Sequence, residues 1–458
     1  MNYIMIVLPT ADASVKKYTQ QAPRYTSYPT ALKFSAVDDM VFARAAKASL
    51  ADEISLYVHI PFCETLCYYC GCNKIVTRHN EKADRYLDYL EREILTKKAL
   101  FKDKKVIALH LGGGSPSFLN NVQHAFLMHI LKKHFHVTDE TECSIELDPR
   151  NVDTQYLDNL ANLGYSRLSF GVQDTNYDVQ YAINRVQSTA NIANLVFHAR
   201  TVGFTSINLD LIYGLPHQTL ESFQTTLVAA KAMSPDRISL FSYAHLPERF
   251  AAQRKIDTDS LPSAELKAKL HALAVDSLTL TGFEMIGMDH FARSGDPLSV
   301  AKQQGKLHRN FQGYTTRGDA DLVGLGVSSI STVGNAYTQN AKKLSDYYAS
   351  VDDNQSAPEK GLTLTQDDLI RRDVIMSLMC NMTLEKRVIE RKFNVNFDEY
   401  FADALEALSS LENDGMVETK SEWVRVPTHA RIFIRAICAR FDAYLNTEHS
   451  VNRYSSSI

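Results

Sequence analysis

The stretch YVHIPFCETLCYYCGCNK, residues 57–74, decides the class of this protein. It holds Cys63, Cys67, Cys70 and Cys72, four of the seven cysteines among 458 residues, in the spacing C-x3-C-x2-C-x-C. Thiols this close together indicate a site for soft metal ions rather than ordinary core side chains. Three thiolates at x3 and x2 spacing can each bind one iron of a four-iron cluster, which leaves the fourth iron open to a small chelating ligand.

Other uses of such a cysteine run fit less well. A structural zinc site usually has two ligand pairs separated by a dozen or more residues, and no second pair follows here. Ferredoxin runs use other spacings and fill every iron with cysteine. Disulfides are disfavoured because the cysteines are few and no export signal is evident, which together indicate the reducing cytoplasm. An iron–sulfur cluster is the favoured interpretation.

The composition is that of a soluble globular protein. Hydrophobic residues make up 45% and charged residues 22% of the chain, and its length favours two or three domains. The net charge of -4 argues against nucleic acid as a main partner. The opening segment MNYIMIVLPTADAS has no basic leader, and its apolar run is too short to span a bilayer. We therefore expect an arm and no association with a membrane.

Short β-branched and apolar runs alternate with amphipathic stretches from residue 55 onward. This alternation predicts a parallel sheet with right-handed helical crossovers. Six such units favour an α/β fold built on a partial (β/α)6 barrel. The predicted strands are SLYVHI (55–60), VIALHL (106–111), CSIELD (143–148), RLSFGV (167–172), SINLDLIYG (206–214) and RISLFSY (237–243).

Polar or glycine-rich residues stand at the end of every predicted strand. In parallel barrels functional groups gather at these carboxyl ends, so we expect all of them on one rim. After the cysteine run, the predicted rim residues are the turn 112–116, Glu146 with Asp148, Gln173, Asp210 and the segment 243–245.

The composition turns polar around residues 352–366, which suggests a linker. Helical patterns follow at 368–380, 384–393 and 397–415, then a β-hairpin, MVETKSEWVRV, and a last helix, THARIFIRAICARFDAYL. We expect an N-terminal arm and helix over 1–50, the barrel with an extension over 51–352, and a mainly helical, winged-helix-like domain over 365–458. Winged helices often bind DNA, but acidic residues outnumber basic ones here, so a packing or lid role is favoured.

Two of the rim features, and Arg185 in the polar stretch VQYAINRVQS, allow two interpretations each. The turn GGGSPS fails the last glycine of the dinucleotide pattern, so it is either a tight turn or a place where the backbone closely approaches a ligand. Glu146 suits ribose hydroxyls or a surface salt bridge. Arg185 offers a fork for a carboxylate, although an arginine on a helix surface is often merely solvated.

The x3-x2 cysteine spacing resembles that of the radical S-adenosylmethionine (SAM) enzymes. Over almost the whole chain, the sequence is similar to the oxygen-independent coproporphyrinogen III oxidases. The segments that carry this resemblance are PRYTSYPT, CYYCGCNK, HLGGGSPSFL, SIELDPR, RLSFGVQD, LDLIYGLPHQT, AHLPERFAAQRKI, HRNFQGYTT and DLIRRDVIMSLMCN. Two departures from the family are Tyr69, where phenylalanine is common, and serine in place of threonine at 115 and 117; the aromatic ring and the hydroxyls are retained.

The resemblance implies which residues bind the cofactors. Cys63, Cys67 and Cys70 would bind one [4Fe-4S] cluster, while Cys72 would stay unligated yet matter for activity. Two SAM molecules are implied. Around the iron-bound SAM would lie Tyr57, Gly113, Glu146 and Ile330; around the second would lie Tyr69, Gly114, Ser115, Gln173, Arg185, Asp210 and Ala244.

The implied reaction converts two propionate side chains of coproporphyrinogen III into vinyl groups, without oxygen, and gives protoporphyrinogen IX. A one-electron donor such as flavodoxin or ferredoxin, a cytoplasmic location and a monomeric state are expected with it. Because the substrate carries four carboxylates, Arg24, Arg309 and Arg317 are candidate contacts. Two alternatives remain at this point: a radical-SAM heme chaperone, and a DNA-linked regulator with an iron–sulfur sensor.

Overall fold

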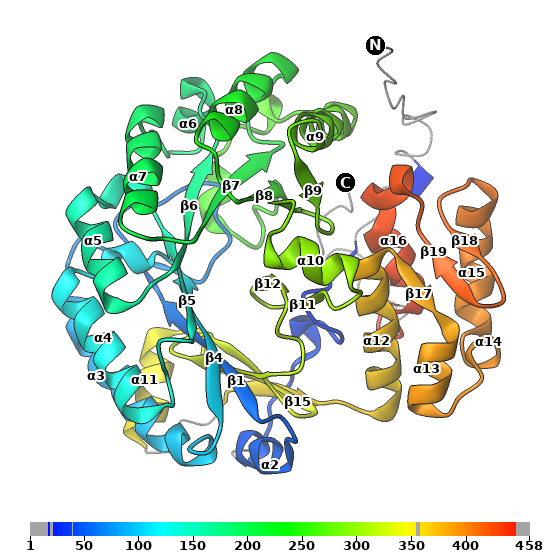
Figure 1. The fold of residues 1–458 in the computed structure, drawn as a ribbon, viewed down its shortest axis with the longest axis horizontal. Coiled ribbons are helices and arrows are strands. Elements are labelled where there is room, and N and C mark those ends of the chain that lie inside the picture. The colour runs from blue at the N-terminus through cyan, green and yellow to red at the C-terminus, as the bar shows by residue number, and fades with distance from the viewer. Residues whose placement is uncertain (1–16, 19–21, 39, 354–357, 446–458) are drawn as a thin grey trace.

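The six predicted strands all form and lie side by side in one sheet (Figure 1). The structure is a computed structural model that describes residues 17–18, 22–38, 40–353 and 358–445. The opening segment that we read as an arm therefore lies largely outside the described residues. The strands are β1 (Glu53–Ile60), β4 (Lys105–Gly113), β5 (Glu142–Leu147), β6 (Arg167–Gln173), β7 (Ser206–Tyr213) and β8 (Arg237–Ser242).

The sheet continues beyond these six strands on both sides. Its order within the described residues is β16-β15-β14-β13-β1-β4-β5-β6-β7-β8-β10-β9. From β13 to β8 all neighbours are parallel, and the outer strands are antiparallel. The partial α/β barrel is thus confirmed and extended by β9 (Phe283–Met285), β10 (His290–Arg293), β13 (Asp321–Leu325), β14 (Ile330–Val333), β15 (Ala336–Gln339) and β16 (Lys360–Thr363).

Helices cover the outer side of the sheet, and most of them connect successive parallel strands (Figure 1). Several of them begin at a side chain that accepts a backbone N–H group of the first turn, as Asn120 does before α4 and Thr219 before α8. The helices of this part are α2 (Val41–Ala48), α3 (Glu81–Lys97), α4 (Asn121–His134), α5 (Thr154–Leu163), α6 (Tyr177–Ala182), α7 (Thr189–Thr201), α8 (Leu220–Ala232), α9 (Ala264–Thr279), α10 (Pro297–Gln303) and α11 (Leu344–Asp352).

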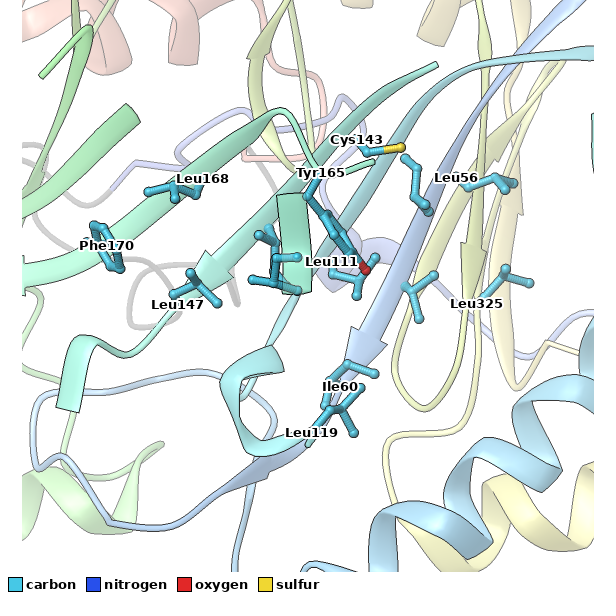
Figure 2. Packing of buried hydrophobic residues seen from close by; sticks show 14 of the residues in the cluster. Leu56, Ile60, Leu111, Leu119, Cys143, Leu147, Tyr165, Leu168, Phe170 and Leu325 are labelled. Carbon is cyan, nitrogen blue, oxygen red and sulfur yellow. The ribbon is translucent and has the colours of Figure 1, made fainter. Parts of the chain in front are cut away.

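The main core lies between the strands and this layer of helices. Alternate strand residues point toward the helices and are buried, such as Leu56 and Ile60 of β1, Leu147 of β5 and Phe170 of β6 (Figure 2). The residues between them on each strand point to the other face of the sheet. That inner face carries the polar side chains, so the strand period separates core from site.

The C-terminal part has a second core of its own. Its helices are α12 (Gln366–Asn381), α13 (Lys386–Phe393), α14 (Phe397–Tyr400), α15 (Ala402–Asn413) and α16 (Ile434–Cys438). The expected hairpin forms as β18 (Glu418–Thr419) and β19 (Trp423–Arg425), and β17 (Thr383–Glu385) joins it as a third strand.

Two expectations for this region differ from the structure. The last helix is short: α16 is flanked by 3-10 turns, and all five of its residues are buried, so packing on every side replaces the amphipathic period. The polar segment read as a linker contains β16, which pairs with β15 at the edge of the large sheet.

The described residues of the arm, 17–18 and 22–30, lie against the C-terminal core. Tyr25 and Tyr28 are buried there, and the Tyr25 hydroxyl donates to Asp442 at 3.1 Å. Arg435 donates to the carbonyl oxygens of Ala22 and Pro23. In the part of the chain that the structure describes, no helix has the length and hydropathy of a membrane span.

Candidate active site

A cavity of about 480 Å³ opens on the inner face of the barrel. Inner-facing residues of neighbouring strands line it, including His110 on β4, Ser144 and Glu146 on β5, Ser169 on β6 and Asn208 on β7. Most of the residues expected from the sequence meet there: Cys63, Cys67, Tyr69, Cys70, Cys72, Gly113, Gly114, Ser115, Glu146, Gln173, Arg185 and Asp210 all line the cavity.

The cysteine run forms a loop at the cavity that is closed at its base. Two short strands, β2 (Phe62–Cys63) and β3 (Ile75–Val76), pair in parallel and bring the two ends of the loop together. The four thiols are free. Burial raises the pKa of the Cys63 thiol to about 12, whereas a hydrogen bond with Cys72 lowers the pKa of the Cys70 thiol to about 6.

This donor set suits a cluster better than one metal ion. Among the described residues, no three side chains of His, Cys, Asp or Glu converge as for a single ion. In a four-iron cluster each thiolate binds a different iron, so the sulfurs need not meet at one point. Three thiols on one cavity wall, beside a space with several polar groups, fit a cluster with an open iron.

The glycine turn after β4, residues 112–117, places backbone without side chains against the start of the cysteine loop. Gly113 has φ +118°, and a Cβ there would lie 2.6 Å from the His59 ring. A Cβ at Gly114 would lie 2.7 Å from the Pro61 backbone. The N–H groups of Gly114 and Ser115 donate to the carbonyl oxygens of Ile60 and Phe62 at 2.8 and 2.9 Å. These contacts pack the glycine turn against residues 59–62, and only glycine fits there. The approach to a ligand that the sequence also allowed stays a prediction.

Glu146 stands in a row of polar side chains on the inner face. Its Oε1 is 3.2 Å from His110 Nε2, and His110 Nδ1 is 2.8 Å from the Ser144 hydroxyl. Although desolvation opposes ionisation, His110 lowers the pKa of Glu146 below its usual value. The Tyr57 ring stacks on His110, with centroids 6.0 Å apart. Glu146 is thus a charged acceptor facing the cavity.

Asp148 and two arginines form a compact ionic group beside Cys67. Arg150 contacts both carboxylate oxygens, with Nε at 2.9 Å from Oδ1 and Nη2 at 2.6 Å from Oδ2. Arg185 Nη1 lies 3.0 Å from Oδ2. Although burial opposes ionisation, Arg185 and Arg150 lower the pKa of Asp148 to about 2. The carboxylate therefore stays charged at neutral pH.

Asp210 lies farther along the inner face, on β7. It accepts hydrogen bonds from Ser169 Oγ at 3.1 Å and Asn208 Nδ2 at 2.8 Å. Burial, with the negative charge of Glu146 adding to it, raises the pKa of Asp210 to about 6. Gln173 ends β6 with φ +66°, at the shift in register between β6 and β7.

Three expected residues, Tyr57, Ile330 and Ala244, do not line the cavity. The Tyr57 hydroxyl is 3.1 Å from His59 Nδ1. Ile330 starts β14, where its backbone lies against Gly324. Ala244 follows β8, and Gln253 Nε2 joins its carbonyl oxygen to that of Tyr69, at 3.1 and 3.0 Å.

The three candidate arginines have different surroundings. Arg317 lines the cavity. Arg309 is buried, pairs with Asp289 at 3.3 Å and stacks on Tyr314, so its charge is already balanced. Arg24 donates to the Ser242 carbonyl oxygen at 2.7 Å, at the end of β8.

Sequence reasoning missed several residues of the cavity wall. A detectable signal existed, because each stands an even number of positions from a predicted residue on the same strand and so shares its face. These residues are His110, Ser144, Ser169 and Asn208; Ser239 also lines the cavity, but its strand β8 holds no predicted residue.

Known protein families match both parts of the chain. The Radical SAM superfamily matches residues 57–230, and the HemN C-terminal domain matches residues 364–433. A protein of Salmonella typhimurium named oxygen-independent coproporphyrinogen III oxidase is 51% identical over 447 residues, which are 97% of this chain and 98% of that protein. Proteins of the same name from Escherichia coli and Pseudomonas aeruginosa are 49% and 43% identical, over 97% and 94% of this chain and 98% and 95% of their own lengths.

A solved structure agrees with these relatives. It is the coproporphyrinogen III oxidase HemN from Escherichia coli, described as a radical SAM enzyme. The two structures superpose with a TM-score of 0.91 at 50% identity, over 94% of this chain and 99% of the other.

Proposed function

The chain belongs to the radical SAM superfamily and, within it, to the oxygen-independent coproporphyrinogen III oxidases, and from this premise we propose how its residues divide the work. The enzyme is an oxidoreductase of heme biosynthesis. It converts two propionate side chains of coproporphyrinogen III into vinyl groups and gives protoporphyrinogen IX. The observation that carries this function is the meeting of the cysteine loop, the glycine turn and Glu146 at one cavity.

A [4Fe-4S] cluster and SAM are the cofactors, and when bound they supply a carbon radical that can remove a hydrogen atom. We assign the cluster to Cys63, Cys67 and Cys70. Cys72 lies on the same loop, and its N–H donates to Cys70 Sγ at 3.5 Å. It is the residue we assign a role in catalysis rather than in binding the cluster.

For the iron-bound SAM, the glycine turn and Glu146 provide complementary contacts. The backbone at Gly113 offers polar groups without a side chain, and Glu146 is a charged acceptor suited to ribose hydroxyls. Tyr57 and Ile330 flank this region. A ligand enclosed by this wall would be shielded from water at the reacting carbon.

A second SAM molecule is a separate proposal. Its contacts would be Tyr69, Gly114, Ser115, Gln173, Arg185, Asp210 and Ala244. The cavity extends past the cluster loop to Asp210 on β7, which supports a second ligand beside the first. Asp210, with a pKa of about 6, is mostly charged at neutral pH and can accept hydroxyl groups.

The reaction balances as an oxidative decarboxylation. A hydrogen atom leaves the propionate β-carbon, the carboxylate leaves as carbon dioxide, and one electron passes to an acceptor while the carbon–carbon double bond forms. Each propionate consumes one SAM. Of the three candidates Arg24, Arg309 and Arg317, only Arg317 lines the cavity, and we propose that it contacts a substrate carboxylate.

The electron donor is proposed to be an acidic one-electron carrier such as flavodoxin or ferredoxin. Basic side chains flank the outside of the cysteine loop. Asn73 donates to the Lys342 carbonyl oxygen at 3.0 Å, and Lys255 stacks over Tyr68. Burial lowers the pKa of Lys342, and the nearby Lys360 and Arg249 lower it further, so these cations lie together. None of them lines the cavity, and Lys360 already pairs with Glu359 at 3.9 Å, so we propose Lys255, Lys342 and Arg249 as the contacts of the donor.

We further propose that the enzyme works in the cytoplasm as a monomer. The heme chaperone alternative is not favoured, because relatives matched over 97% of the chain are named as oxidases.

The test is an anoxic reconstitution of the cluster, followed by incubation with SAM, a reductant and coproporphyrinogen III. We expect 5′-deoxyadenosine and protoporphyrinogen IX together. Release of 5′-deoxyadenosine without protoporphyrinogen IX would reject the substrate while keeping the superfamily. Purified protein that holds zinc and no iron would reject the whole proposal.

A further inference from the structure

Two guanidinium groups donate to the sulfur of Cys67. Arg150 Nη2 lies 3.5 Å and Arg185 Nη1 3.4 Å from Sγ. Cys67 is only 7% exposed, and the side chains of Arg150 and Arg185 are 18% and 7% exposed, so water screens these contacts weakly. When the proposed cluster is bound, Cys67 would be a thiolate that binds iron. Both contacts would then be charge-assisted hydrogen bonds to a cluster ligand.

The backbone around this group is fixed from several sides. Asp148 precedes a 3-10 turn (Pro149–Asn151), and its N–H donates to Ser117 Oγ at 3.1 Å. Its carboxylate then holds Arg150 through two contacts. Because Ser117 belongs to the glycine turn, the turn, Asp148 and the cluster loop are linked in one chain of hydrogen bonds.

Arg185 is anchored separately. It donates to the Gly171 carbonyl oxygen through Nε at 3.3 Å and Nη2 at 2.7 Å. A Cβ at Gly171 would lie 2.8 Å from Arg185 Nη2, so the arginine packs directly on bare backbone. Neither guanidinium is free to swing away without breaking several hydrogen bonds.

The charges leave a net positive group facing the sulfur. Asp148 balances one of the two arginines, and the second charge is left for the thiolate of Cys67. Hydrogen bonds to cluster sulfurs and net local charge are two of the factors that set the potential of an iron–sulfur cluster. Positive charge and N–H donors favour the reduced cluster, which carries one more electron.

We infer that Arg150, held by Asp148, is a positioning residue that raises the reduction potential of the cluster through the Cys67 sulfur. This inference rests on the proposed function, since it needs a cluster at this site. It assigns Arg150 a part in electron entry that is separate from binding SAM or substrate. Arg185 adds to the same effect, whatever ligand it also contacts.

The test is a redox titration of the reconstituted enzyme without SAM, followed by the paramagnetic resonance signal of the reduced cluster. We expect Arg150→Gln to lower the ratio of reduced to oxidised cluster at a fixed potential about tenfold, or about 59 mV for one electron. Arg150→Lys keeps the charge but loses the planar fork, so its shift should be smaller. Iron content should stay as in the wild type, because Arg150 is not a ligand.

Arg92→Gln is the matched control, because it removes the same charge from the outer surface of α3, where Arg92 pairs with Asp352. Its potential should equal that of the wild type. Wild-type potentials in both Arg150 variants would overturn the inference, as would loss of iron from both, which would indicate a purely structural role. A wild type that binds a cluster and makes product, while the Arg150 variants show no shift, would leave the proposed function standing. A wild type without a cluster would reject both.

Discussion

Glu93 on α3 is the centre of a buried ionic network, and replacing it by glutamine should strongly destabilise the protein. Its carboxylate accepts four hydrogen bonds. Lys97 Nζ donates to Oε1 at 2.5 Å, and the side chains of Lys97 and Glu93 are 5% and 1% exposed. The other donors are Gly326 N at 2.7 Å, Asn340 Nδ2 at 2.7 Å and the Tyr347 hydroxyl at 2.8 Å.

The magnitude follows from what Glu93→Gln leaves behind. Each carboxylate oxygen faces two donors, so the new amide nitrogen would confront two donors whichever way it turned. The Lys97 ammonium would also lose its counter-ion in a dry environment. Breaking a buried pair on one side costs about 3–5 kcal/mol, and we expect a loss in this range.

A matched pair on the surface provides the control. Glu265 and Lys269 have the same i, i+4 spacing on a helix and the same 2.5 Å distance, but their side chains are 54% and 57% exposed. Because exposed pairs contribute about 0.2–1 kcal/mol, Glu265→Gln should change stability by less than about 1 kcal/mol.

Unfolding by urea under anoxic, reducing conditions, followed by circular dichroism, would measure both variants. A further variant, Glu93→Gln with Lys97→Met, should recover part of the loss because it removes the unpaired charge. Equal effects of Glu93→Gln and Glu265→Gln would refute the reasoning that burial decides the strength of the pair.

Three further outcomes test the site. Gly113→Ala should weaken SAM binding at least about tenfold, or about 1.4 kcal/mol by calorimetry, whereas Gly203→Ala, at φ +104° with no atom within 4 Å of its Cβ, should leave binding intact. Cys67→Ser should abolish the cluster absorbance and iron content, and Cys143→Ser, at a buried thiol outside the cavity, should preserve both. Burial raises the pKa of Asp210 to about 6 in the folded state. The wild type should therefore lose stability relative to Asp210→Asn as the pH rises from about 4 to about 6, and the difference between the two proteins should then stay constant. A difference in unfolding free energy that does not change across this window would contradict the raised pKa.

The sheet was predictable where its strands are long and their neighbours follow in sequence. Six runs with a period of two and helices between them leave few other arrangements. The strands β13 to β16 could not be predicted, because they are short and because β13, which the others follow, takes its place by pairing with β1. Leu56 of β1 pairs with Val323 of β13, far along the chain. The local sequence of a strand does not indicate which distant strand it pairs with.

The site shows the same division. The cysteine run, the glycine turn and Glu146 are recognisable because their types and spacing are unusual. His110 and Asn208 are ordinary residues that matter through the face of the strand they occupy. Arg150 was missed because its significance lies in a contact with Cys67 across the fold, and spacing gives no sign of that contact. Arg309 illustrates the reverse, since Asp289 neutralises a cation that looked available.

The arm also constrains how the protein is made. Tyr25 bonds to Asp442, a partner 417 residues later in the chain. While the chain is still being synthesised, Tyr25 and Tyr28 have no core to pack against. The C-terminal segment must leave the ribosome before the N-terminal arm can fold onto it. A chain truncated before this segment would therefore expose the tyrosines of the arm to solvent, and chaperones and proteases would act on it as on an incompletely folded protein.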